Sequence, residues 1–180
     1  MHREAYVWVI ETVSLLRIPT AEVVEVGSRL VTPAQYPLCL REAIPHGRWI
    51  GLDQSPGYNV DVVADGLTWE PPRRPTLVLC CEVLEHAERA GDLFKRCLGW
   101  LRPQGWMVAT MAAPGRPPHS GRHEGDPDPD EWYRPVSAGE LLGWATDAGC
   151  AFDHLTVETE PFHRDLYIAA RVRWPGEGGE

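Results

Sequence analysis

Five short apolar runs, separated by turn-forming residues, dominate the first two thirds of this chain. Each run has the length of a β-strand. The run at 76–81 is the most continuously apolar, as expected for a central strand of a parallel sheet. The runs predict strands at about 22–27, 48–53, 60–64, 76–81 and 106–111.

Two longer segments repeat apolar residues at the spacing of an α-helix. Residues 3–16 predict an amphipathic helix within an N-terminal segment, 1–20, that leads into the fold and packs on the sheet. Residues 88–101 show the same spacing, and Pro103 and Gly105 end that helix. The apolar positions are Tyr6, Val9, Val13 and Leu16 in the first segment and Leu93, Phe94, Cys97, Leu98 and Leu101 in the second.

A shorter helix is expected between the first two strands. Proline inside a helix costs about 3 kcal/mol, so Pro37 belongs at the start of this helix and Pro45 beyond its end. We therefore expect a helix from near Tyr36–Pro37 to near Ile44.

A long loop and a capped helix follow the fifth run. Residues 112–136 are rich in proline, glycine and acids, and a loop of this length inside a compact domain is often functional. Ser137 and Glu140 have the spacing of a capping box. They predict a helix that runs to about Ala148 and ends at Gly149.

The chain ends in two further strand patterns, at 151–158 and 165–173. Their short connection predicts an antiparallel hairpin, and the glycine- and glutamate-rich tail, 175–180, is expected to fray. Taken with the preceding runs, the order predicts an α/β fold: a mostly parallel sheet of seven strands with helical cover. A length of 180 residues suits one domain, 1–180.

Composition narrows the function classes. The formal net charge is −9, and the only short basic cluster is Arg73-Arg74, which disfavours nucleic acid as a partner. No apolar stretch is long enough to span a membrane, and the charged N-terminus disfavours a signal peptide. The five cysteines are odd in number and lack CxxC spacing, which favours a reducing cytoplasm without disulfides or zinc.

Candidate chemistry lies where the first two strands end. Gly27 follows the first strand, and Asp53 ends the second, one β-α-β unit later. A glycine turn lets the backbone approach a ligand, and an acid at the next strand tip accepts ribose hydroxyls. This pattern predicts a nucleoside-containing cofactor.

Several further segments, in order, make the chain resemble the class I S-adenosylmethionine-dependent methyltransferases, over about 21–158. The resemblance is closest to small members with an "evLEH" segment, and it implies a three-layer, Rossmann-like sandwich. It departs where Arg29 and Val31 replace later glycines of the first motif, and where Gln104 replaces a glycine. The matching segments are Glu25-Val26-Gly27-Ser28-Arg29, Asp53, Val60–Gly66, Glu82-Val83-Leu84-Glu85-His86, Leu101–Gly105 and Asp130-Glu131-Trp132-Tyr133-Arg134.

The resemblance implies that S-adenosyl-L-methionine is the cofactor and S-adenosyl-L-homocysteine the product. It divides the chain into a cofactor-binding half, 21–111, an active-site loop, 112–136, and a C-terminal helix and hairpin, 137–174. The expected cofactor-binding residues are Glu25, Val26, Gly27, Ser28, Asp53, Gln54, Asp65, Gly66, Cys81 and Glu82.

Catalytic candidates follow the fourth strand and the long loop. Glu85 and His86 are either a helix-start pair or a catalytic base or metal ligand facing the methyl group. Tyr133 is a further catalytic candidate, and His119, Trp132 and Arg134 are expected to bind substrate. For Tyr133 and Arg134, anchoring the loop is the alternative.

The same loop has the composition of a cation site, with two histidines and a run of acids. A solvated acidic loop is far commoner, so no metal site is expected. Cys80 and Cys81 lie on a buried strand, where inert thiols are the default. The acids and histidines are His119, His123, Asp126, Asp128, Asp130 and Glu131.

The favoured hypothesis is methyl transfer from S-adenosylmethionine to an oxygen or nitrogen of a small molecule or a protein side chain. A non-catalytic nucleoside-binding module of the same fold is the alternative. A dinucleotide-dependent dehydrogenase is disfavoured because G-x-G-x-x-G is missing and a terminal hairpin is predicted. Cys80–Val83 lacks the N/D-P-P-Y/W/F motif of amino-methylating DNA enzymes, which also disfavours DNA as a substrate.

Overall fold

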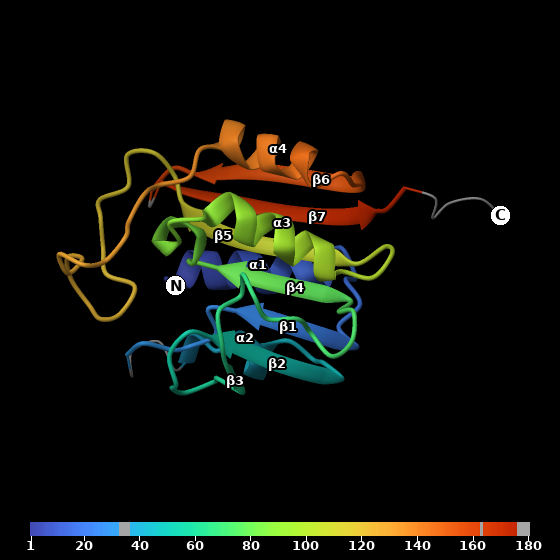
Figure 1. Cartoon of the computed structure of the whole chain (residues 1–180), viewed down its shortest axis with the longest axis horizontal. Coiled ribbons are helices and arrows are strands. Elements are labelled where there is room, and N and C mark those ends of the chain that lie inside the picture. The colour runs from blue at the N-terminus through green and yellow to red at the C-terminus, as the bar shows by residue number, and fades with distance from the viewer. Residues whose placement is uncertain (33–36, 163, 176–180) are drawn as a thin grey trace.

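A seven-stranded sheet runs through the protein in a computed structural model that describes residues 1–32, 37–162 and 164–175 (Figure 1). The strand order is β3-β2-β1-β4-β5-β7-β6. The first five of these pair in parallel, and β7 pairs antiparallel with both β5 and β6. The strands are β1 Glu22–Val26, β2 Arg48–Asp53, β3 Val62–Val63, β4 Leu77–Cys81, β5 Trp106–Ala112, β6 Ala151–Glu160 and β7 Asp165–Arg173. The predicted fold class, including the antiparallel hairpin, is confirmed.

Helices cover both faces of the sheet and make three layers (Figure 1). The helices are α1 Arg3–Leu15, α2 Leu40–Ala43, α3 Ala90–Trp100 and α4 Ala138–Asp147. Apolar residues of α1 and α2 pack on one face, and those of α3 and α4 pack on the other. Because side chains alternate along a strand, Leu77 and Leu79 of β4 face the first layer, and Val78 and Cys80 face the second. Both faces of β4 are thus buried, which is why its sequence is continuously apolar.

Two elements are shorter than the sequence predicts. Helix α2 begins at Leu40, later than the expected start near Tyr36–Pro37, of which Tyr36 lies outside the described residues. Strand β3 has only Val62–Val63, because Asp61 turns its side chain to the neighbouring strand. The Asp61 carboxylate accepts a hydrogen bond from Gly51 N at 2.8 Å and pairs with Arg41.

The predicted capping box is present at the start of α4. Ser137 Oγ accepts a hydrogen bond from Glu140 N at 3.2 Å, and the Glu140 carboxylate accepts one from Ser137 N at 3.0 Å. Both contacts satisfy backbone donors that a helix start leaves free. Gly149 follows the helix with φ +71°, as predicted for its terminator.

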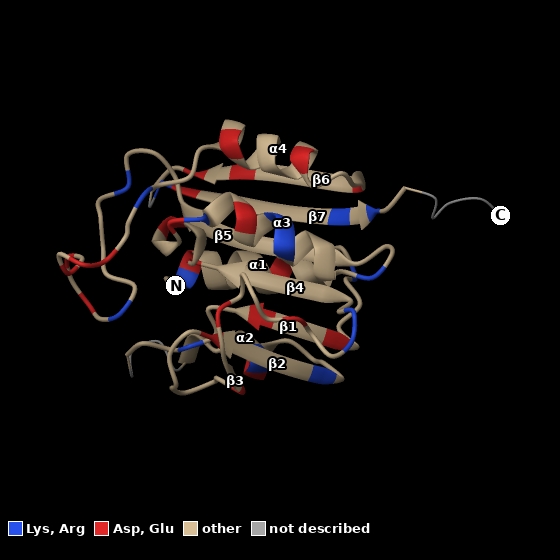
Figure 2. Ribbon diagram, viewed as in Figure 1, with Lys and Arg blue, Asp and Glu red and all other residues tan. Residues whose placement is uncertain are grey.

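The long loop between β5 and α4 extends beyond the carboxyl ends of the parallel strands, on the side where the N-terminus lies (Figure 1). This is the edge at which open α/β sheets bind ligands. Lys and Arg are scattered among Asp and Glu along the ribbon (Figure 2). No helix among the described residues is long and apolar enough to cross a membrane. The tail at 176–180, which was expected to fray, lies outside the described residues.

Candidate functional site

The turn after β1 depends on Gly27. This residue has φ +69°, a conformation that costs other L-residues about 1–2 kcal/mol. Its N–H donates to Leu52 O at 2.8 Å, which closes the turn against β2. A Cβ atom at this position would lie 2.2 Å from Val83 Cγ2. The predicted tight turn therefore has both a conformational and a steric reason to be glycine.

Glu25 supports the turn through buried hydrogen bonds. Its carboxylate is buried and accepts hydrogen bonds from Trp49 Nε1 at 3.1 Å and Asn59 Nδ2 at 2.8 Å. Burial raises the pKa of Glu25 to about 7, although these two hydrogen bonds oppose the rise. Asn59 also donates to Ser28 O at 3.0 Å, so the acid orients the turn through Asn59.

Asp53 lies at the tip of β2, as predicted, and faces the turn. Its carboxylate accepts hydrogen bonds from Arg29 N at 3.2 Å and Ser55 N at 2.9 Å. Arg29 Nε lies 3.7 Å from Oδ1 of this carboxylate, whereas Arg29 N donates to Oδ2. Arg29, which replaces a family glycine, thus contacts the residue expected to bind ribose.

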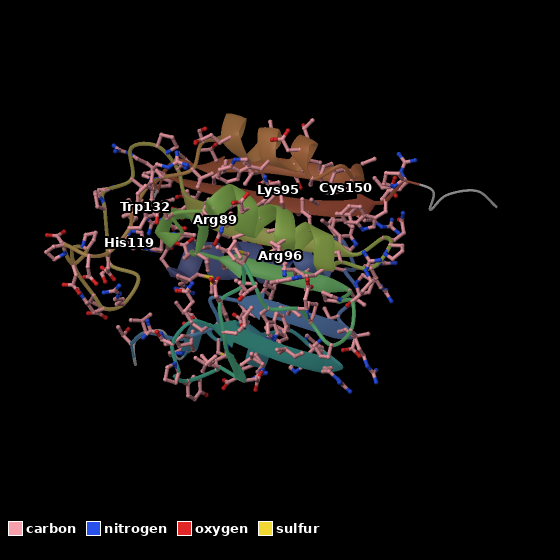
Figure 3. All side chains as sticks on the ribbon, in the orientation of Figure 1. Arg89, Lys95, Arg96, His119, Trp132 and Cys150 are labelled. Atoms are coloured by element: carbon pink, nitrogen blue, oxygen red, sulfur yellow. The ribbon has the colours of Figure 1, made fainter. Side chains whose placement is uncertain are left out.

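A cavity of about 350 Å³ opens at this edge of the sheet. All ten expected cofactor-binding residues line it, together with His86, His119 and Trp132. Figure 3 shows His119 and Trp132 on the long loop, whereas Arg89, Lys95 and Arg96 lie along α3. The lining also includes residues that the sequence did not single out, among them Met1, Val83, Ser120, Gly121 and Arg122.

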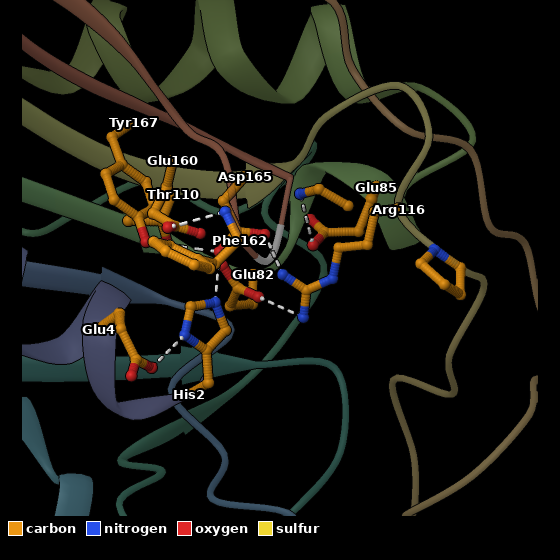
Figure 4. Close-up of polar contacts among 12 residues, drawn as sticks. His2, Glu4, Glu82, Glu85, Thr110, Arg116, Glu160, Phe162, Asp165 and Tyr167 are labelled. Carbon is orange, nitrogen blue, oxygen red and sulfur yellow. Dashed lines mark hydrogen bonds and ion pairs between the residues drawn. The ribbon is translucent and has the colours of Figure 1, made fainter.

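Glu82 ends β4 beside this cavity in a strained conformation. Its φ is +56°, which is unusual for a residue with a side chain and is typical of functional positions. Glu82 N donates to Thr110 O at 2.7 Å, and its carboxylate accepts from Thr110 Oγ1 at 2.8 Å. Arg116 lies 3.7 Å from the same carboxylate. These contacts hold Glu82 in place at the strand end (Figure 4).

A buried ion network lies next to Glu82 and joins three distant parts of the chain (Figure 4). Asp165 is fully buried and pairs with both Arg116 and His2. Burial alone would raise the pKa of Asp165, but its two cationic partners hold it below its usual value. No motif links positions 2, 116 and 165, so sequence reasoning missed this network.

Glu85 lies one turn beyond Glu82, in the short 3-10 helix Leu84–His86. It is completely buried, and one oxygen accepts a hydrogen bond from Ala112 N at 3.0 Å. The other oxygen, Oε2, is buried without a hydrogen-bond partner among the described residues. Burial, reinforced by the charge of Glu82, raises the pKa of Glu85 to about 8.

Three of the predicted catalytic and substrate residues come together around Glu85. The ring of His86 lies 5.0 Å from that of His119 and 5.4 Å from that of Tyr133, and the last two are 5.0 Å apart. Burial lowers the pKa of His86 to about 4, with a further contribution from His119. Burial likewise raises the pKa of Tyr133 to about 12. At neutral pH both imidazoles are therefore uncharged, since the pKa of His119 is also lowered, chiefly by burial.

Arg134 and Tyr133 are not among the residues that line the cavity. Arg134 pairs with Glu140 at 2.6 Å, and its N–H donates to Glu85 O at 2.8 Å. The Tyr133 hydroxyl donates to Pro117 O at 3.3 Å. These contacts agree with the alternative that both residues anchor the loop.

The fold and this site define a class of protein: an α/β domain with a nucleoside-sized cavity at the carboxyl edge of its parallel strands. A model of a methyltransferase domain family matches residues 7–155. The chain belongs to this family, and the predicted class I S-adenosylmethionine-dependent methyltransferase is confirmed as its class.

Individual relatives agree with this assignment. The ubiquinone biosynthesis O-methyltransferase of Leptothrix cholodnii is 24% identical over 128 residues, with 61% of this chain and 51% of that protein covered. The chain thus spans about half the length of this curated relative.

Solved structures show the same fold at low sequence identity. The 1,6-didemethyltoxoflavin-N1-methyltransferase of Burkholderia thailandensis, with 1,6-didemethyltoxoflavin and S-adenosylhomocysteine bound, has a TM-score of 0.62 and 16% identity over 95% of this chain and 77% of that one. The N-methyltransferase NodS of Bradyrhizobium japonicum, in complex with S-adenosylhomocysteine, has a TM-score of 0.62 and 16% identity over 96% and 87%. The magnesium protoporphyrin IX methyltransferase of Synechocystis, with S-adenosylmethionine bound, has a TM-score of 0.61 and 15% identity over 94% and 78%.

Proposed function

We propose that this protein transfers a methyl group from S-adenosylmethionine to an oxygen or nitrogen atom of a small molecule. One observation carries the proposal: all ten residues expected to bind the cofactor line the same cavity at the carboxyl edge of the sheet. These residues come from well-separated segments of the chain, so their convergence on one cavity supports a cofactor site.

The family resemblance implies the orientation of the cofactor, and the lining of the cavity supports it. Asp53 receives the ribose hydroxyls, Asp65 and Gly66 flank the adenine, and Gly27 lies against the amino-acid part. The sulfonium then points toward Glu82 and the loop that carries His119. Glu82, held by Thr110 and Arg116, keeps a carboxylate close to this positive charge.

The acceptor enters on the side of His86, His119 and Trp132, which line the same cavity. Its nucleophilic atom attacks the methyl carbon in line, the carbon–sulfur bond breaks, and S-adenosylhomocysteine leaves. The proton of the acceptor passes to a neutral base, and the uncharged imidazoles of His86 and His119 supply that chemistry.

A small molecule is favoured over a protein side chain by the relatives, whose names include a toxoflavin precursor and magnesium protoporphyrin IX as substrates. The net charge of −9 and the scattered cations make nucleic acid an improbable partner. A reducing cytoplasm is supported by the five cysteines, all of which are free.

One observation favours the second candidate, a binding module that does not catalyse. Arg29 occupies the space beside Asp53 with both its N–H and its guanidinium. A competing guanidinium weakens the binding of ribose to Asp53. The family glycine would keep the backbone N–H but would remove this guanidinium.

Calorimetry with S-adenosylmethionine and S-adenosylhomocysteine tests the cofactor site. We expect micromolar dissociation constants for the wild type. Losing two charge-assisted hydrogen bonds to ribose costs about 3 kcal/mol, so Asp53→Ala should bind about 100-fold more weakly. Asp92→Ala, at a carboxylate paired with Arg89 on the outer face of α3, is the matched control and should bind as the wild type does.

Two outcomes would contradict the proposal. The first is no binding of either ligand at millimolar concentration by a folded wild type. The second is unchanged affinity in Asp53→Ala. Tight binding without any S-adenosylhomocysteine formed from a panel of phenols and heteroaromatic amines would favour the non-catalytic module.

A further inference from the structure

Three metal-ligating side chains converge beside the cavity. Glu85, His86 and His119 each offer a ligand atom, and these atoms all lie within 4.8 Å of one another. Two of the three follow β4, and the third comes from the long loop more than thirty positions later. The fold thus brings a carboxylate and two imidazoles to one point.

The buried carboxylate of Glu85 has an oxygen with no hydrogen-bond partner among the described residues. One oxygen is fixed by Ala112 N, whereas Oε2 is buried with no hydrogen-bond partner among the described residues. A buried, unpaired carboxylate oxygen is costly. Either a proton or a cation must compensate it.

The two imidazole rings face one another edge-on, with their centroids 5.0 Å apart. Imidazole is the commonest protein ligand of transition-metal ions.

We propose that Glu85, His86 and His119 form a site for one divalent transition-metal ion of the zinc, cobalt, iron or manganese class. Two nitrogens and one carboxylate are the ligand set that these ions prefer. The nearby positive charge of Arg116 does not oppose the site, because Arg116 is neutralised by Glu82 and Asp165.

Three protein ligands leave coordination positions open, as in catalytic rather than structural sites. His86 and His119 line the cavity, so the open positions face the proposed acceptor. With a metal bound, the two imidazoles would act as ligands in place of their role as bases, and the metal itself would bind the acceptor oxygen and lower its pKa, which favours a hydroxyl-bearing acceptor. This consequence rests on the proposed methyl transfer, whereas metal binding itself does not.

Cobalt binding tests the site without any turnover. The full chain is stripped with a chelator and titrated with Co²⁺, whose visible absorption reports nitrogen and oxygen ligands, and Zn²⁺ then competes for the site. We expect one equivalent of Co²⁺ to bind to the wild type. Glu85→Gln and His119→Ala should each weaken binding by more than about 10-fold, since even the loss of a residue that only supports a metal ligand typically costs about 10–100-fold.

His123→Ala is the matched control. His123 lies on the same loop, 3.3 Å from Asp128, in a second and more exposed group of possible ligands. Loss of the cobalt spectrum in His123→Ala, with Glu85→Gln unchanged, would overturn the proposal. Absence of stoichiometric binding to the wild type would overturn it too.

Calorimetry with S-adenosylhomocysteine on the same samples separates the two proposals. Intact cofactor binding with no metal binding refutes only the metal site. Intact cofactor binding also shows that Glu85→Gln and His119→Ala are folded, so their cobalt titrations decide the question.

Discussion

Gly27→Ala is the change whose cost follows most directly from the structure. The new Cβ would lie 2.2 Å from Val83 Cγ2, and the backbone would keep φ +69°. The left-handed conformation costs about 1–2 kcal/mol, and the added methyl group overpacks its surroundings at about 1–3 kcal/mol. We therefore expect Gly27→Ala to lower the free energy of unfolding by about 2–5 kcal/mol.

A second substitution separates the two causes. Val83→Ala removes the methyl group that the new Cβ would meet, so in the double variant the steric part of the cost disappears. The backbone part, about 1–2 kcal/mol, remains. The two substitutions should therefore be less destabilising together than the sum of their separate effects, by about 1–3 kcal/mol.

Urea unfolding followed by tryptophan fluorescence measures these free energies, since the chain contains eight tryptophans. Calorimetry with S-adenosylhomocysteine follows the cofactor site, where Gly27→Ala should weaken binding because the turn must shift. If Gly27→Ala is within about 0.5 kcal/mol of the wild type, as for an ordinary surface substitution, the steric argument is wrong. Strict additivity with Val83→Ala would also refute it.

Two further predictions concern buried charges. Because burial raises the folded-state pKa of Glu25 from 4.5 to about 7, the contribution of Glu25 to the free energy of unfolding should fall as pH rises through this window, by on the order of 3 kcal/mol. Glu25→Gln should flatten this part of the profile in urea titrations at several pH values, and an unchanged slope would contradict the assignment. Asp165→Asn removes the fully buried carboxylate that pairs with Arg116 and His2 and leaves Arg116 only Glu82, at 3.7 Å, so it should cost about 3 kcal/mol, whereas Arg89→Ala removes only an exposed pair with Asp92 and should cost less than about 1 kcal/mol. Equal losses in the two urea titrations would show that the Asp165 network is not stabilising.

The sheet was predictable because its central strands are buried on both faces. In β1, β4 and β5 nearly every position packs into one of the two helical layers, so the sequence there is a plain apolar run. The short elements were less predictable. The Asp61 carboxylate accepts a hydrogen bond from Gly51 N just before β3 begins, and no local sequence pattern predicts this contact.

The cofactor side of the site was predictable for a related reason. Gly27 and Glu82 directly follow strands and Asp53 ends one. Because parallel strands end at one edge of the sheet, these residues lie close together although they are far apart in sequence. The network of His2, Arg116 and Asp165 lacks this advantage. Arg116 and Asp165 meet because β7 pairs with β5, where Asp165 lies opposite Ala112, and His2 joins them from the segment before α1.

The exceptions to local rules gather at one place in the sheet. Gly27 and Glu82 both have positive φ, and Glu25 and Glu85 are both buried acids. All four lie at the carboxyl ends of β1 and β4, which are neighbours with Val26 opposite Cys80. This is the switch point of the sheet, because the chain continues from β1 toward β2 and β3 on one side, and from β4 toward β5 on the other. The two outgoing connections diverge there and leave a cavity, so strained backbone and buried charge at this point can face a ligand. Asp165, a buried acid at the start of β7, is instead compensated by Arg116 and His2.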